Sequence, residues 1–197
     1  MKSASQRQRL TRAETTAATR DRIARCAHTL LFKYQYEDVT LVDIAKAAGV
    51  SHQTVLNHFE SKEGVALAVF ELVRVETELA RYRARPGDVK GAVKALLGEY
   101  ERMGDVNISW LRSAQRLQRL AEALNVGRES HRGWVEAMFG DGLPQHRAAR
   151  RRAVNGLYAA TDVYVWKLLR RDLLLSRGET EKIMTDLVFG VLKGPYE

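Results

Sequence analysis

The chain has 197 residues, a hydrophobic content of 45% and a formal net charge of +8. This length allows one domain or two small ones, with enough apolar residues for an ordinary core. A single cysteine, Cys26, excludes an intrachain disulfide framework, and no apolar run reaches the roughly 20 residues that span a bilayer. We therefore expect a cytoplasmic protein with no membrane partner, whose positive charge favours polyanions.

The N-terminal residues 1–15 are polar and basic and show no apolar periodicity, which predicts a flexible basic arm. Such an arm is either a solvated tail or an element that contacts nucleic acid. Apolar residues then recur at helical spacing from residue 16 to residue 34, so we expect the first helix there. Cys26 and His28 lie in this helix, and we interpret them as a buried thiol and a partly covered histidine rather than a ligand pair.

Residues 40–62 (TLVDIAKAAGVSHQTVLNHFESK) have the pattern of two short helices joined by a tight turn, followed by a third helix start. Thr40 and Asp43 have the spacing of a capping box at the start of the first short helix. Gly49 ends that helix, because so tight a turn requires a residue that adopts a positive φ. Ser51 is the expected cap of the second short helix.

The second short helix, residues 51–59, has two chemically different faces. Val55 and Phe59, with Leu56 beside them, form an apolar face that must pack on the preceding helices. The opposite face carries uncharged polar groups that can read base edges in a major groove: Ser51, Gln53, Thr54, Asn57 and His58. In a basic chain this arrangement indicates a DNA-binding helix-turn-helix. Lys62 lies in the first turn of the next helix, which runs to about residue 83, where a helix start already favours a phosphate.

The clearest break in the chain is the sequence RPGD at residues 85–88. We place the domain boundary there, with a DNA-binding domain over 16–84 and a second domain over 85–197. Asp105, Asn107, residues 140–144 and residues 176–178 supply further breaks. The expected helices of the second domain are 88–103, 107–125, 128–139, 144–174 and 178–193. No alternating strand pattern is present, so the predicted fold is all-α.

Two segments of the second domain are apolar enough to need cover on more than one side. Residues 153–169 are apolar nearly all the way round, and residues 183–192 form a broad apolar stripe. These helices either complete a single larger core or pair with their symmetry mates in a four-helix arrangement. The candidate dimer-interface residues are Val154, Leu157, Thr161, Val165, Leu168, Ile183, Leu187, Val188 and Val191.

Aromatic and sulfur-containing side chains of the same domain are typical either of core packing or of an apolar ligand cavity. Asp162 is a candidate polar group for such a cavity. The remaining candidate lining residues are Tyr100, Met103, Trp110, Trp134, Met138, Phe139, Tyr158 and Trp166.

Enzyme signatures are missing from the sequence. The five histidines are scattered, and there is no metal-binding motif, phosphate-binding glycine loop or nucleophile elbow. We expect no enzyme activity, no metal and no cofactor. A catalytic site assembled from distant residues stays as an alternative.

The helix-turn-helix residues resemble the N-terminal signature of the TetR family of bacterial transcriptional regulators. The matching residues are Thr40, Ile44, Ala45, Ala48, Gly49, Val50, Ser51, Thr54, Val55, His58, Phe59 and Lys62. The resemblance implies a homodimer that binds a palindromic operator in double-stranded DNA and represses transcription. It also implies that a small apolar effector bound to the C-terminal domain releases the DNA. An effector-independent DNA-binding dimer is the alternative.

The resemblance implies roles for individual residues as well. His52, Gln53 and Asn57 are the candidates for base reading. The candidates for phosphate contact are Thr40, Ser51, Thr54, His58 and Lys62. Leu56 replaces the family's usual tyrosine, and Val42 stands where some members place a base-reading side chain, so both offer only apolar contacts.

Overall fold

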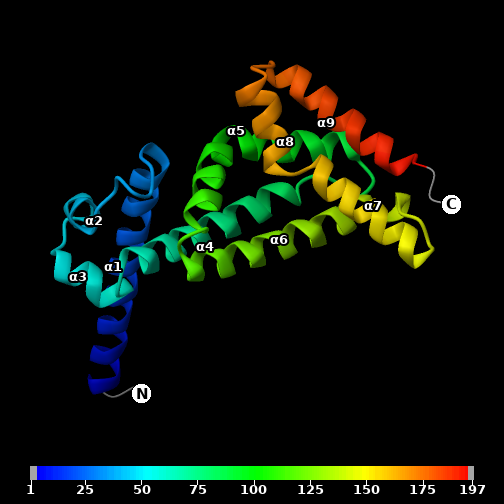
Figure 1. The fold of residues 1–197 in the computed structure, drawn as a ribbon. Coiled ribbons are helices and arrows are strands. Elements are labelled where there is room, and N and C mark those ends of the chain that lie inside the picture. The colour runs from blue at the N-terminus through cyan, green and yellow to red at the C-terminus, as the bar shows by residue number, and fades with distance from the viewer. Residues whose placement is uncertain (1–3, 195–197) are drawn as a thin grey trace. The chain divides into compact units, whose positions relative to one another are not determined.

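The computed structural model describes residues 4–194, and all regular structure within that range is helical (Figure 1). The all-α prediction is confirmed. The chain forms two compact units, residues 1–72 and residues 73–197. Their boundary lies inside helix α4 (Lys62–Arg81), not at the RPGD turn. The sequence break marks the end of a helix, but the first part of α4 belongs to the core of the first unit.

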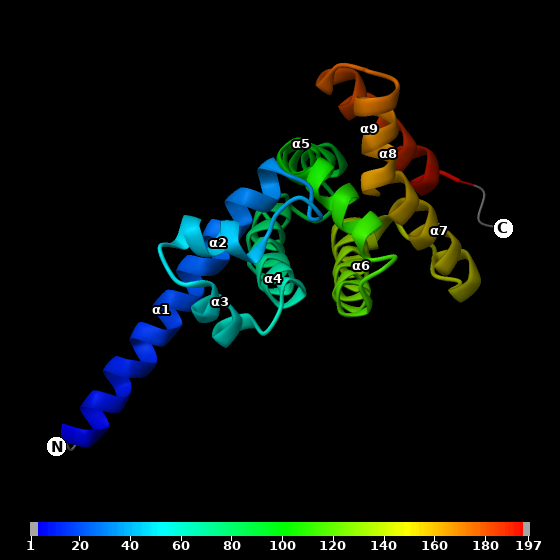
Figure 2. The same cartoon turned by 60° about the vertical axis from the view of Figure 1, so that its left-hand side comes forward.

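The first unit contains α1 (Ala4–Lys33), α2 (Leu41–Ala48), α3 (His52–Phe59) and the first part of α4 (Figure 2). Helix α2 packs against α1 and against α3. The predicted capping box is present, because the Thr40 hydroxyl accepts from the Asp43 N–H and the Asp43 carboxylate accepts from the Thr40 N–H. Gly49 ends α2 with φ of 62°, and the Ser51 hydroxyl caps α3. Each of these features was predicted from the sequence.

Helix α1 begins much earlier than expected. It runs from Ala4, so residues 4–15 are helical, and residues 1–3 lie outside the described range; the flexibility of this basic arm stays a prediction. This segment contains neither glycine nor proline and is rich in good helix formers such as glutamine, arginine and alanine. The lack of apolar periodicity shows only that the segment has no face to bury, which does not prevent a helix.

The second unit contains α5 (Val89–Ser113), α6 (Gln118–Phe139), the 3₁₀ turn η1 (Gly140–Gly142) and α7 (Arg147–Ala160). It continues with α8 (Val163–Lys167), the π-helical turn η2 (Leu168–Asp172) and α9 (Arg177–Leu192). Its core is formed by buried residues of α5 to α9. No helix in the described part of the chain is long and apolar enough to cross a membrane.

Three predicted helix boundaries in the second unit are wrong. The expected break between residues 125 and 128 is absent, because α6 is continuous from Gln118 to Phe139, and the chain leaves the helix at residues 114–117 instead. The expected break at Asp105 and Asn107 is absent, and α5 continues to Ser113 because both residues lie on its surface-facing turns without interrupting the backbone ladder. The expected single helix over 144–174 is instead interrupted at residues 161 and 162. There the Thr161 hydroxyl donates to the Leu157 carbonyl at 2.7 Å, and the Asp162 carboxylate caps the start of α8.

Candidate nucleic-acid interface

Helix α3 presents an uncharged polar face to solvent. Its apolar side is buried, with Val55 0% and Phe59 4% exposed. His52, Gln53 and Asn57 are exposed on the other side. Burial of one face therefore fixes the rotation of this short helix, and the three predicted base-reading side chains are left accessible.

The side-chain amides of Gln53 and Asn57 on this face form a hydrogen bond with each other. Gln53 Nε2 donates to Asn57 Oδ1 at 2.9 Å, as expected for residues four apart on a helix. The bond uses neither the Gln53 carbonyl oxygen nor the two N–H groups of the Asn57 amide. The exposed edge therefore carries both a donor and an acceptor, which is the combination that an adenine edge in the major groove requires.

The two predicted apolar contacts differ in accessibility. Val42, in the first turn of α2, is 61% exposed, so its methyl groups are free to meet a base. Leu56 is half-buried. Part of Leu56 packs within the first unit, and the remainder is available for contact with a thymine methyl group.

The predicted phosphate contacts are already engaged within the first unit. The Thr40 hydroxyl donates to Asp43 at 2.6 Å, and the same hydrogen bond holds the pKa of Asp43 below its usual range. The Ser51 and Thr54 hydroxyls lie 2.8 Å apart in a hydrogen bond. His58 is half-buried. These groups therefore organise the ends of α2 and α3 before any ligand is bound.

Lys62 is held against the loop between α1 and α2. Its ammonium donates to the Glu37 carbonyl at 3.2 Å and lies 4.3 Å from the centroid of the Tyr36 ring. Burial lowers the pKa of Lys62, while Glu37 and Asp38 oppose that shift. An ammonium has three N–H donors, so two remain for a phosphate.

The predicted pocket residues of the second unit lie in its interior. Tyr158 and Asp162 are half-buried. The other seven are buried: Tyr100, Met103, Trp110, Trp134, Met138, Phe139 and Trp166. The indole N–H of Trp134 has no hydrogen-bond partner among the described residues.

A chain of polar groups, which sequence reasoning missed, passes through this interior. The Arg81 guanidinium pairs with the Glu99 carboxylate, with Nη2 donating at 2.7 Å, and Glu99 is only 2% exposed. Arg81 Nη1 lies 3.0 Å from His131 Nδ1, and His131 Nε2 lies 3.0 Å from Thr161 Oγ1. Tyr100 donates to the Thr161 carbonyl at 2.9 Å. This chain links α4, α5, α6 and the end of α7.

The tautomer of His131 follows from its partners. Arginine only donates, so His131 Nδ1 must accept and Nε2 must carry the proton. Nε2 then donates to the Thr161 hydroxyl, whose own proton goes to the Leu157 carbonyl. Burial first, and the Arg81 charge second, lower the pKa of His131 to about 3. The sequence did carry a signal, since His131 falls on the same apolar helical stripe as Trp134 and Val135.

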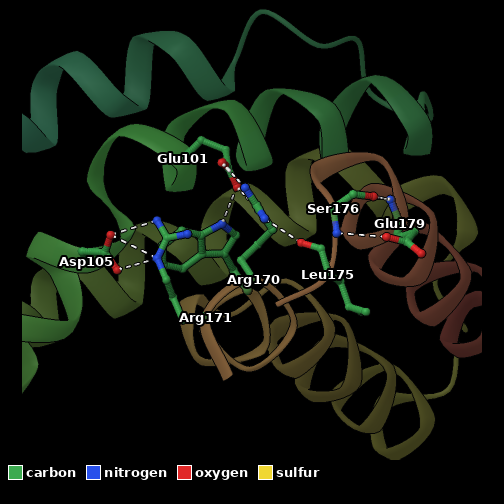
Figure 3. A network of polar contacts seen from close by, with 8 residues as sticks. Glu101, Asp105, Arg170, Arg171, Leu175, Ser176 and Glu179 are labelled. Atoms are coloured by element: carbon green, nitrogen blue, oxygen red, sulfur yellow. Dashed lines mark hydrogen bonds and ion pairs between the residues drawn. The ribbon is translucent and has the colours of Figure 1, made fainter. Parts of the chain in front are cut away.

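A second polar cluster fastens α8 and η2 to α5 (Figure 3). Arg170 donates to both oxygens of Glu101, at 2.7 and 2.9 Å, and Arg171 to those of Asp105, at 2.9 and 2.8 Å. The Trp166 indole also donates to Glu101 at 3.0 Å. The hydrogen bonds from Arg170, more than those from Trp166, lower the pKa of Glu101 to about 2.

The predicted dimer interface needs correction. Helix α7 packs against α9, and Gly156 allows Val191 to approach so closely that a Cβ on the glycine would lie 3.0 Å from it. The two apolar stripes therefore face each other within one chain. Four of the predicted residues are buried in the second unit and unavailable to a partner: Val154, Leu157, Thr161 and Val188. Leu168 and Leu187 are 49% and 43% exposed. The remaining three are half-buried: Val165, Ile183 and Val191.

Acidic, cysteine and histidine side chains are the groups in this chain that could ligate a metal ion. Within residues 4–194, no group of three or more of them is placed to hold a metal ion.

Comparison with known proteins identifies the first unit. Residues 23–69 match the sequence profile of a family described as bacterial regulatory proteins, tetR family. The HTH-type transcriptional regulator AlkX of Mycobacterium tuberculosis is 40% identical over 50 residues. That match covers 25% of this chain and 24% of AlkX, so the chain spans about a quarter of the length of this relative.

Solved structures resemble nearly the whole chain. Salmonella enterica GusR has a TM-score of 0.70 at 20% identity, covering 90% of this chain and 96% of GusR. A complex of SmeT with triclosan has a TM-score of 0.66 at 19% identity, covering 88% of this chain and 90% of SmeT. At these identities the likeness shows the fold alone. The helix-turn-helix segment, residues 23–69, therefore belongs to the family of tetR bacterial regulatory proteins, and nearly the whole chain shares the fold of these solved structures.

Proposed function

We propose that this protein is a DNA-binding transcriptional regulator and that α3 reads base edges in the major groove. One observation carries the proposal: Val55 and Phe59 are buried while Gln53 and Asn57 are exposed on the opposite face. Glutamine and asparagine are the side chains that pair with both adenine atoms N6 and N7. His52, exposed at the start of the helix, is the third base-reading side chain. The match of residues 23–69 to the tetR family of bacterial regulatory proteins also supports a role in transcriptional regulation.

Phosphate contacts on either side of α3 set its register on the duplex. Lys62 supplies a charge-assisted donor from the start of α4 while it keeps its bond to Glu37. Thr40 contacts a phosphate only by exchanging its bond to Asp43, because both its hydroxyl and its N–H are directed to that carboxylate. Ser51, Thr54 and His58 complete the set at the two ends of α3.

The functional state is a homodimer on a palindromic operator, located in the cytoplasm with the DNA. A symmetric dimer places two reading helices about 34–36 Å apart, which is one turn of the duplex. Leu168 and Leu187 are the interface residues most accessible to a partner, with half-buried Val165, Ile183 and Val191 beside them. Large exposed leucines on a helical unit are the side chains that association would cover.

A small apolar effector bound to the second unit releases the DNA. The aromatic interior crossed by a few polar groups has the composition of a ligand site, and the Trp134 indole N–H is a buried donor with no partner within residues 4–194. SmeT, which has a similar fold, was solved as a complex with triclosan. An effector acts only if it binds more tightly to the arrangement that does not fit the operator. The resulting regulator is a repressor.

The decisive experiment for base reading is Asn57→Ala, with Gln35→Ala, an exposed loop residue, as the control. Binding to a selected operator should weaken by about 1–3 kcal/mol, while binding to a scrambled duplex should change little. Equal losses on both duplexes would remove Asn57 from the base-reading set.

A panel of small apolar molecules, triclosan among them, tests the effector. Fluorescence anisotropy of a labelled operator should fall when an effector releases it, and the intrinsic tryptophan fluorescence of the protein should change at the same concentration. A panel in which no molecule releases the operator would favour a DNA-binding dimer without an effector.

A further inference from the structure

The two helices of the helix-turn-helix end in different ways. Helix α2 ends at Gly49, and the following N–H of Val50 returns to the Ala45 carbonyl at 3.0 Å, so its terminal carbonyls are closed by backbone groups. Helix α3 ends at Glu60, which has φ of 65° and ψ of −38° without being glycine. Side chains other than glycine rarely adopt this region, so the end of α3 needs support from elsewhere.

Arg20 of α1 supplies that support. Its Nη1 donates to the carbonyl oxygen of His58, in the last turn of α3. Its guanidinium carbon also lies 4.2 Å from the centroid of the Phe59 ring. A cation at this end meets the negative pole of the helix dipole as well as a carbonyl without a helical partner.

Together the two contacts suit the planar fork of a guanidinium. A planar group can stack on an aromatic face and donate in its own plane at the same time, whereas an ammonium is a point charge without a face. Phe59 is buried in the first unit, so Arg20 ties a backbone carbonyl and a buried ring at the end of α3 to helix α1. The exposed amides of Gln53 and Asn57 lie on the same two-turn helix.

We propose that Arg20 is a positioning residue for DNA recognition: it holds the C-terminal end of α3 so that Gln53 and Asn57 keep their register toward the bases. This inference rests on the proposed function of α3 as the reading helix. Arg20 is itself exposed, so the competing role is direct contact with a phosphate. The two roles differ in what they do to specific and non-specific binding.

The test compares Arg20→Lys and Arg20→Met with Arg25→Lys and Arg25→Met. Arg25 is the matched control because it is an exposed arginine of the same helix that forms an ion pair with Asp21, one turn earlier in α1. Binding of the full chain to its selected operator and to a scrambled duplex is measured by anisotropy across a salt series. Circular dichroism checks that each variant is folded.

The positioning role predicts that both Arg20 variants lose about tenfold or more in operator affinity. The Arg20 variants should bind the scrambled duplex about as tightly as the Arg25 variants do. The salt dependence of their DNA binding should also be close to that of the Arg25 variants. A phosphate contact would give a different result: Arg20→Lys would bind normally, and Arg20→Met would lose affinity for both duplexes, with a salt slope reduced by about 0.9. That result, or normal operator binding by both variants, would overturn the inference.

Amide hydrogen exchange provides a readout without DNA. Exchange at residues 56–60 should be faster in both Arg20 variants than in the Arg25 variants, and unchanged exchange would overturn the inference. Failure of the proposed function would look different, because then the wild-type chain itself would select no DNA sequence. The exchange measurement would still decide whether Arg20 holds α3.

Discussion

The second unit should lose stability at mildly acidic pH, because His131 takes up a proton more readily in the unfolded chain than in the folded one. His131 is 5% exposed, accepts from Arg81 and donates to Thr161, so only its neutral form satisfies these partners. Adding a proton at Nδ1 would place two donors and two positive charges 3.0 Å apart in the interior. The buried imidazole therefore resists protonation until the pH is far below the usual pKa of histidine.

The sign and size of the effect follow from linkage. The pKa of His131 falls from 6.5 in the unfolded chain to about 3 in the folded chain. Below pH 6.5 the unfolded chain binds a proton that the folded chain does not, so the free energy of unfolding decreases as the pH falls toward 3. Between pH 7 and pH 5 the loss is about 2 kcal/mol, at about 1.4 kcal/mol for each pH unit below 6.5.

The measurement is urea unfolding at pH 7, 6 and 5, followed by tryptophan fluorescence. All three tryptophans, Trp110, Trp134 and Trp166, lie in the second unit, so the signal reports that unit. His131→Gln is the comparison, because glutamine offers one acceptor and one donor but does not titrate. Burial raises the pKa of Asp162, which acts in the opposite direction, and this contribution cancels between the two proteins.

Wild-type protein should lose about 2 kcal/mol more stability than His131→Gln between pH 7 and pH 5. Equal losses in the two proteins would refute the buried, neutral His131 and the hydrogen-bond directions assigned to it.

Four further substitutions test other parts of the molecule. Lys62→Ala should lower the slope of log affinity against log salt by about 0.9, because one phosphate contact is lost; an unchanged slope in a salt titration would remove Lys62 from that role. Leu187→Glu should shift the sedimentation pattern from dimer to monomer, and persistent dimers would place the interface elsewhere. Gly64→Ala should lower stability in urea by about 1–3 kcal/mol, because its Cβ would lie 2.0 Å from the Phe59 carbonyl oxygen. Gly133→Ala is the control, because its Cβ would meet nothing within 4 Å, and it should raise the free energy of unfolding by about 0.5–1 kcal/mol. Equal effects of Gly64→Ala and Gly133→Ala on stability would contradict the close packing of Gly64 against Phe59.

The helix ends of the first unit could be predicted because their signals are local. Thr40 with Asp43, Gly49 and Ser51 each act on backbone groups within a few residues, and each acts as the sequence indicated. The amphipathic division of α3 was equally visible, since Val55 and Phe59 lie four residues apart. These features need no knowledge of distant parts of the chain.

The second unit was harder because its decisive contacts are distant in sequence. Thr161 looks like one position of an apolar helix until His131, 30 residues away, is placed against its hydroxyl. Likewise, Val191 and the residues around Gly156 form apolar stripes that suit a partner subunit or each other equally well. Only the packing of α7 on α9 decides that they cover each other.

The most direct test of the central claim is selection of bound duplexes from a random library by the full chain. The account predicts enrichment of a two-fold symmetric sequence whose half-sites lie about one helical turn apart. It also predicts that Asn57→Ala loses that preference at particular base pairs while it still binds DNA. A wild-type chain that binds all duplexes alike, or none, would contradict the assignment of α3 as a reading helix.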